Sequence, residues 1–188
     1  VFEALVELTK KKVKAHPQIM IPQISSIAEL NHIKKIFDSI KKEMETKHKM
    51  KLKISFGTMI EVVRAALTAN ELAKTAEFFS FGTNDLTQGT FSFSREDVEG
   101  KFLPEYMEKE LLERNPFQSI DENGVGSLMK IGIGMGRKVR PNMEIGICGE
   151  HGGDPNSIKF CHGEGLSYVS ASPHRIPIAI VAAAQAAI

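Results

Sequence analysis

The sequence predicts an α/β fold built on a parallel sheet, and three observations support this class. Short apolar runs recur along the 188 residues, and segments with helical periodicity separate them. The composition is 42% hydrophobic and 25% charged, which is typical of a globular protein, and we expect a single domain over residues 1–188. The net charge of +1 provides no bulk field to attract nucleic acid or an anionic membrane, so any bound anion must be held locally.

The first three elements are predicted to be a helix, a strand and a second helix. Apolar residues at helical spacing, followed by lysines, predict an amphipathic helix over 1–14 that Pro17 ends. The apolar run 19–21 is typical of a fully buried parallel strand. A long helix should then run from Ser25 or Ser26 to about His48, and its mixture of lysines and acidic residues is typical of a solvated face.

The same alternation continues to the end of the chain. Apolar runs predict further strands at 54–61, 78–84, 144–148 and 167–171. Helical periodicity predicts further helices at 64–76, 122–137, 157–162 and 176–187. The stretch 86–121 breaks this rhythm, and a long connection of this kind is usually functional or an interface.

The sequence contains no membrane-spanning or secretory signal. The most apolar stretch, 176–188, is interrupted by Gln185 and falls short of the roughly 20 residues that cross a bilayer. Two cysteines, Cys148 and Cys161, are too few for a disulfide scaffold and favour a reducing compartment. We therefore expect a cytoplasmic protein, or an organellar one in a eukaryote.

The chain begins with Val1 rather than Met, so we expect it to be part of a longer protein.

Two carboxylates mark the carboxyl ends of neighbouring predicted strands, where parallel α/β folds bind their ligands. Glu61 and Asp85 lie one strand-and-helix repeat apart, so we expect them to converge. So few hard oxygen ligands leave room for water and substrate, and they suit Mg²⁺ better than zinc. The structural alternative is that Glu61 caps the following helix and Asp85 makes an Asx turn.

A glycine and a cysteine at the same predicted edge add further chemistry. Gly82 precedes Thr83 and Asn84, and a glycine beside turn-forming residues lets backbone N–H groups approach a carboxylate or phosphate. Cys148 ends the fourth strand, and an ordinary thiol pKa of about 8.5 leaves it protonated at neutral pH, able to act as a general acid. The alternative for Cys148 is a small buried hydrophobe, which is our prediction for Cys161.

One glycine-rich run is not expected to bind phosphate. The run Gly132-Ile133-Gly134-Met135-Gly136 is similar to a dinucleotide-binding fingerprint. However, Arg137 occupies the position of the last glycine, and the run ends a predicted helix instead of opening one.

Four motifs in a fixed order cover nearly the whole chain. They are Gly57-Thr58-Met59-Ile60-Glu61-Val62, Phe79-Ser80-Phe81-Gly82-Thr83-Asn84-Asp85-Leu86-Thr87-Gln88, Gly146-Ile147-Cys148-Gly149-Glu150-His151-Gly152-Gly153-Asp154-Pro155 and Tyr168-Val169-Ser170-Ala171-Ser172-Pro173. Together they resemble the C-terminal phosphoenolpyruvate/pyruvate-binding domain of the pyruvate, phosphate dikinase family, one of the PEP-utilising enzymes. The second motif is shared with sugar-phosphotransferase enzyme I and phosphoenolpyruvate synthase, whereas the turn after Cys148 separates the dikinases from these relatives.

The resemblance implies a (β/α)8 TIM barrel, of which this chain would supply the C-terminal part, about five β/α units. The intact enzyme would transfer a phosphoryl group between a phosphohistidine, on another domain of the same full-length chain, and pyruvate. Pyruvate, ATP and phosphate would thereby give phosphoenolpyruvate, AMP and pyrophosphate. The family also implies a homodimer.

The resemblance further implies roles for individual residues. Glu61 and Asp85 would hold Mg²⁺. Cys148 would exchange a proton with the methyl or methylene carbon of the substrate. The residues expected to contact substrate are Glu61, Gly82, Thr83, Asn84 and Asp85.

The chain departs from the family pattern in two ways. Val63 stands where the family usually has proline. The arginines that clamp phosphate and carboxylate come from the first three strands of the family's barrel, which this chain lacks, so we expect the chain alone to be inactive. Two alternatives stay open: another phosphoenolpyruvate-dependent phosphotransferase, of the enzyme I or synthase type, and a non-catalytic dimerisation module.

Overall fold

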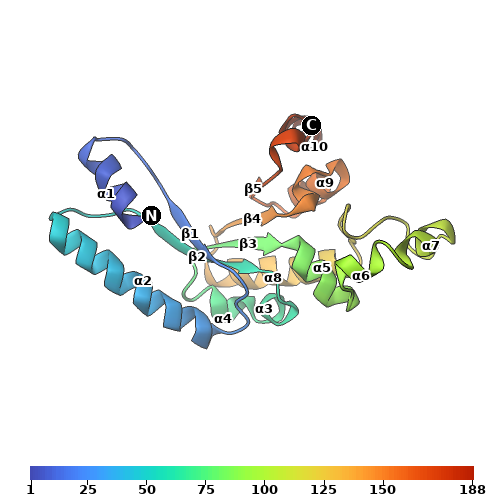
Figure 1. Ribbon diagram of the computed structural model, residues 1–188, viewed down its shortest axis with the longest axis horizontal. Helices are drawn as coiled ribbons and strands as arrows, with labels where there is room; N and C mark the ends of the chain where they lie inside the picture. The colour runs from blue at the N-terminus through green and yellow to red at the C-terminus, as the bar shows by residue number, and fades with distance from the viewer.

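The computed structural model describes residues 1–188 and confirms a parallel α/β sheet. Its strands are β1 Gln18–Ile21, β2 Ser55–Ile60, β3 Phe78–Gly82, β4 Glu144–Cys148 and β5 Tyr168–Val169. They lie side by side in chain order, and every neighbouring pair is parallel. The sheet is not closed, because β1 and β5 form free edges (Figure 1). Consecutive parallel strands in chain order are the arrangement of a barrel wall, which confirms the expected partial barrel.

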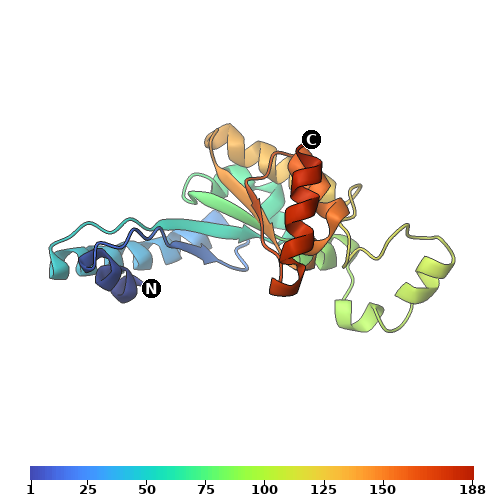
Figure 2. The same cartoon turned by 90° about the horizontal axis from the view of Figure 1, so that it is seen from above.

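Helices connect the strands, as the alternation predicts. They are α1 Phe2–Lys10, α2 Ile27–His48, α3 Val63–Leu67, α4 Ala69–Leu72, α5 Thr83–Phe91, α6 Arg95–Val98, α7 Leu103–Glu108, α8 Val125–Val139, α9 Pro155–Gly163 and α10 Ile176–Ala186. Two 3₁₀ helices, η1 Glu150–Gly153 and η2 Pro173–Arg175, follow β4 and β5. Both views place α1 at one end of the molecule and α7 at the other (Figure 1, Figure 2). None of these helices combines the length and the apolar character that crossing a membrane requires.

The long helix α2 begins where the sequence predicts, because Ser26 and Glu29 form a capping box. The Glu29 N–H donates to Ser26 Oγ at 3.3 Å, and the Ser26 N–H donates to Glu29 Oε2 at 2.9 Å. Two N–H groups that have no partner inside the helix are satisfied in this way. The cap therefore sets the direction in which the chain leaves β1.

Strand β3 ends earlier than the sequence predicts. Thr83, Asn84 and Asp85 do not continue the strand into a turn but form the first turn of α5. Polar and acidic residues suit this position, because the N–H groups of a first helical turn lack partners and carry partial positive charge. The predicted glycine turn is therefore wrong: Gly82 has a φ of −84°, and the N–H groups that follow it belong to a helix start.

Several other boundaries differ from the prediction, and the first helix ends at Lys10 instead of near residue 14. The predicted helix 64–76 is split into α3 and α4 at Thr68, whose φ of −127° is not helical. The predicted strand 167–171 supplies only the two-residue β5, which pairs with β4 alone. Helix α5 takes up the start of the stretch 86–121, so the long connection spans 92–124, hereafter called the excursion.

The main core lies between the sheet and the helices that pack on it. Helix α8 contacts the sheet through two of its glycines. A Cβ atom at Gly132 would lie 3.1 Å from the Phe81 ring, and one at Gly136 would lie 2.8 Å from the Phe79 ring. The glycine-rich run thus lies within a helix, as predicted, and close packing on two buried phenylalanines explains Gly132 and Gly136.

The excursion has a small core of its own. Its buried members are Val98, Leu103 and Phe117, and partly buried Phe93, Phe102 and Leu112 pack around them. The Arg95 guanidinium carbon lies 5.7 Å from the centre of the Phe117 ring, a cation–π distance. Figure 2 shows α6 and α7 standing apart from the sheet, so the excursion is a folded appendage rather than a plain loop.

Replacing either of two glycines of α8 by alanine should change the stability of the fold in opposite directions. No atom would lie within 4 Å of a Cβ at Gly134, so Gly134→Ala should stabilise the fold by about 0.5–1 kcal/mol through helix propensity. Gly136→Ala should destabilise it by about 1–3 kcal/mol, because its Cβ meets the Phe79 ring. Thermal denaturation of both variants measures the difference, and equal shifts would contradict the packing described.

Candidate functional site

The residues predicted to form a site meet at the carboxyl end of the sheet. Glu61 directly follows β2, while Gly82 and Cys148 end β3 and β4 and pair with each other in the sheet register. Gly82 lies against the Glu61 side chain and pairs with Cys148, and Gln23 contacts both Glu61 and Asp85, so the three groups lie in one region. We call this region, at the carboxyl ends of β2, β3 and β4, the mouth.

Glu61 is a buried carboxylate that does not cap a helix. Only 5% of the residue is exposed, and its Oε1 accepts a hydrogen bond of 2.6 Å from the Gln23 backbone N–H. Helix α3 begins after Val62 with no side-chain cap, so the structural alternative for Glu61 is excluded. Burial raises the pKa of Glu61, and the nearby Asp85 carboxylate adds to this increase although the Gln23 N–H opposes it.

Asp85 is held by two glutamine side chains rather than by an Asx turn. Its Oδ2 accepts from Gln23 Nε2 at 3.1 Å, and its Oδ1 accepts from Gln88 Nε2 at 3.0 Å. Gln23 therefore contacts both carboxylates, one through its backbone and one through its side chain. It does so with a positive φ of 56°, in the loop after β1. Sequence reasoning missed Gln23, because no spacing or motif signals a left-handed residue there.

Gly82 makes room for Glu61, and the Asn84 side chain lies beside Gly149, directly after β4. A Cβ atom at Gly82 would overlap the Glu61 carboxylate and the Met59 side chain, so glycine is needed for Glu61 to lie here. The Asn84 Oδ1 atom is buried and has no hydrogen-bond partner in the protein. A buried acceptor without a partner is costly, so this oxygen is suited to a ligand or a cation.

The Cys148 thiol is half-buried and remains protonated. Its Sγ lies 3.7 Å from the Phe81 carbonyl oxygen, to which it donates. Burial raises the thiol pKa, and the charges of Glu61 and Asp85 raise it further. Cys161 has no such setting: it is 1% exposed in the core, as predicted, and burial raises its pKa to about 12.

Two residues without a predicted role lie beside the thiol. Ser80 is buried in β3, its hydroxyl has no hydrogen-bond partner in the protein, and it pairs across the sheet with Gly146. Tyr168 belongs to β5, and its ring lies where a Cβ on Gly146 would be. A thiol, a hydroxyl and a phenol are thus grouped at one side of the mouth.

Thr83 contacts both the end of β4 and a buried histidine. The Thr83 hydroxyl lies 3.1 Å from the Cys148 carbonyl oxygen and 2.7 Å from His151 Nδ1. His151 is completely buried, and its Nε2 lies 2.9 Å from the Pro116 carbonyl oxygen. The side chain of Thr83 is therefore engaged within the protein. Sequence reasoning assigned His151 only to a characteristic turn, since its partners are far away along the chain.

The oxygen donors at the mouth suit a hard divalent cation. No three His, Cys, Asp or Glu side chains are grouped so as to hold a metal ion. What the mouth offers is two carboxylates and the unpartnered amide oxygen of Asn84. Mg²⁺ accepts this kind of oxygen set, because it keeps several waters and takes the remaining ligands from substrate.

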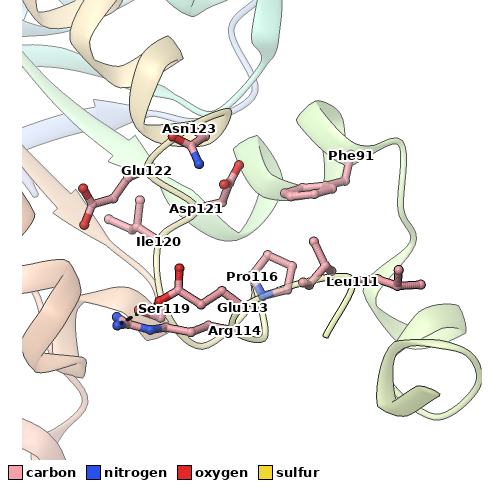
Figure 3. Close-up of a pocket in the computed structure, with 11 residues that line it drawn as sticks. Phe91, Leu111, Glu113, Arg114, Pro116, Ser119, Ile120, Asp121, Glu122 and Asn123 are labelled. Carbon is pink, nitrogen blue, oxygen red and sulfur yellow. Dashed lines mark ion pairs between the residues drawn. The ribbon is translucent and has the colours of Figure 1, made fainter. Parts of the chain in front are cut away.

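A separate hollow lies away from the mouth. It measures about 430 Å³ and is bordered by Phe91 and by residues 111–114, 116 and 119–123 (Figure 3). An ion pair of 3.3 Å joins Arg114 and Glu113 at its rim. None of the residues predicted to form the site borders it, so the chemistry described above does not extend into this hollow.

The comparison with known proteins is consistent along the chain. Residues 2–188 match the family described as PEP-utilising enzyme, PEP-binding domain. The chain is 52% identical over 187 residues to the pyruvate, phosphate dikinase of Entamoeba histolytica, covering 99% of the chain and 21% of that protein. It is 50% identical to pyruvate, phosphate dikinase 2 of Oryza sativa subsp. japonica and 48% identical to the enzyme of Clostridium symbiosum. It spans 21% and 22% of their lengths.

The fold has a more distant structural counterpart. A citrate lyase of Burkholderia xenovorans superposes with a TM-score of 0.58 at 15% identity, over 88% of this chain and 48% of that protein. This likeness concerns the fold alone. The family match covers almost every residue that builds the sheet and the mouth, and the chain therefore belongs to the family of the PEP-utilising enzyme, PEP-binding domain.

Proposed function

We propose that this chain is the part of a pyruvate, phosphate dikinase that binds pyruvate and phosphoenolpyruvate and carries out proton transfer at the substrate carbon. The observation that carries the proposal is geometric: Gln23 donates to both Glu61 and Asp85, and Glu61 lies against Gly82, which pairs with Cys148 in the sheet. Support comes from 48–52% identity to three proteins of that name. The phosphoryl donor would be a phosphohistidine on another domain, within a homodimer located in the cytoplasm or an organelle.

The two carboxylates form the cation-binding half of the proposed site. Glu61 and Asp85 would hold Mg²⁺, which when bound would polarise the substrate carbonyl oxygen as a Lewis acid. Gln23 and Gln88 would keep Asp85 oriented, since partners of this kind fix the direction of a ligating oxygen. Gly82 would leave room for Glu61, and the buried Asn84 oxygen would gain a partner.

The thiol forms the proton-transferring half. Cys148 stays protonated at neutral pH because burial and two negative charges raise its pKa. It would give its proton to the methylene carbon when pyruvate forms and become a thiolate, and in the reverse direction that thiolate would take a proton from the methyl carbon. The first N–H groups of α5, at Thr83 and Asn84, would bind the substrate's carboxylate or phosphate at a helix start.

Replacing the thiol tests the catalytic role directly. Cys148→Ala in the full-length protein should lower the rate of pyruvate formation from phosphoenolpyruvate by at least about a hundredfold, the usual contribution of a general acid. Cys161→Ala is the matched control and should keep the rate, because Cys161 is enclosed in the core. If Cys148→Ala keeps its turnover but subunits no longer associate, the module is a dimerisation device and not catalytic.

Replacing the carboxylates tests the cation site. Glu61→Gln and Asp85→Asn should each weaken Mn²⁺ binding by at least about tenfold, since each removes a charged ligand. Glu144→Gln, at the opposite end of β4, should leave binding unchanged. Electron paramagnetic resonance separates free from bound Mn²⁺ during a titration. Equal affinity of Glu61→Gln and the unaltered protein would exclude Glu61 as a ligand.

The pH dependence of alkylation tests the electrostatics of the thiol. Iodoacetamide reacts with thiolate. Because the pKa of Cys148 is raised, the pH at which its alkylation rate reaches half of the maximum should lie above the ordinary range of a thiol. Glu61→Gln removes a negative charge that raises this pKa, so the midpoint should move to lower pH. Glu144→Gln should not move it. Peptide mass spectrometry gives the rates, and a midpoint that is unchanged in Glu61→Gln would show that the two side chains do not interact.

A further inference from the structure

The turn after β4 contains a buried histidine that the proposed chemistry does not use. His151 lies in η1, is fully buried, and has both ring nitrogens within hydrogen-bond distance of a partner. One partner, Thr83, lies at the mouth. The other is the carbonyl of Pro116, on the returning part of the excursion (Figure 3). A buried polar ring is tolerated only when its nitrogens are satisfied, so these contacts determine where the ring lies.

Counting protons assigns a direction to each contact. A carbonyl oxygen only accepts, so His151 Nε2 carries the proton that is donated to Pro116. In a neutral ring, Nδ1 then accepts from the Thr83 hydroxyl at 2.7 Å. Burial lowers the pKa of His151 and favours this neutral form, although the Pro116 carbonyl and the Asp154 charge oppose the effect. The same hydroxyl lies 3.1 Å from the Cys148 carbonyl oxygen, so its proton is shared between His151 Nδ1 and this oxygen in a bifurcated hydrogen bond.

Neighbouring polar contacts fasten the excursion to the same turn. Ser119 Oγ donates to Asp154 Oδ2 at 2.9 Å, and the Ile120 N–H donates to Ser157 Oγ at 2.9 Å. On its other side the turn touches the backbone, since a Cβ at Gly152 would overlap the Ser170 carbonyl. Of the contacts between the turn and the excursion, that of His151 is the one that continues to the mouth through Thr83.

We propose that His151 is a positioning residue that holds the Thr83 hydroxyl and so fixes the ends of β3 and β4 relative to each other. The Cys148 carbonyl lies at the end of this chain of contacts, so the position of the Cys148 backbone, and with it that of the thiol, depends on His151. The inference rests on the proposed function only for the importance of the thiol. The contacts themselves join the excursion to the mouth whatever the reaction is.

The rate at which Cys148 is alkylated measures this positioning. In the full-length protein, His151→Phe removes both contacts and should speed alkylation at neutral pH about fivefold, since losing a hydrogen bond lets the half-buried strand end open more often. His151→Gln keeps an amide donor and acceptor and should give a smaller increase. Cys161 is the internal reference and should stay unreactive in every variant that is folded.

Two further variants separate positioning from general loosening. Ser119→Ala removes a contact between the turn and the excursion that does not lead to Thr83, so it should lower the melting temperature and leave Cys148 alkylation unchanged. Thr83→Val removes the shared hydroxyl and should match His151→Phe, and the double variant should show no additional increase. If His151→Phe does not fold, His151→Gln and Thr83→Val carry the test.

The outcomes are distinct. Unchanged Cys148 alkylation in His151→Gln and Thr83→Val would overturn the proposal, as would an equal increase in Ser119→Ala, which would make His151 merely structural. Turnover that survives Cys148→Ala would instead contradict the proposed function, and it would leave the alkylation result standing.

Discussion

Two carboxylates held close together at one edge of a parallel sheet are the constraint on which the rest of the site depends. Like charges at short range repel, and burial of Glu61 adds to the cost of its charge. The protein offsets this with donors: the N–H and amide of Gln23 and the amide of Gln88. Gly82 leaves the space that Glu61 occupies. Burial and the two negative charges together raise the pKa of the Cys148 thiol, so the carboxylates and the thiol form one electrostatic arrangement.

The sequence predicts the parts of this arrangement that follow from regular geometry. Parallel strands bring their carboxyl ends to one edge, which is why the positions of Glu61, Asp85 and Cys148 in the amino-acid sequence are enough to group them. Other parts depend on contacts without a local signal. Gln23 reaches the carboxylates through a left-handed φ in a loop, and His151 meets partners 68 and 35 residues away. The segment after Gly82 suits a turn and a helix start equally, so packing decides the outcome.

The excursion is tied to the mouth at two points, although its own core stands apart. At its beginning, the Arg95 N–H donates to Gln88 Oε1 at 3.0 Å, and the same glutamine donates to Asp85. At its end, Pro116 accepts from His151, which contacts Thr83. A long connection is usually tolerant of change, but both ends of this one continue into residues that build the site.

The groups of the mouth all belong to β2, β3 and β4 or directly follow them, and each of these strands has a neighbour on both sides. Strand β1 contributes through the loop that follows it, where Gln23 donates to both Glu61 and Asp85. The packing of β1 on β2 therefore helps to set the spacing of the two carboxylates, and a change in that packing would reach them without altering either side chain.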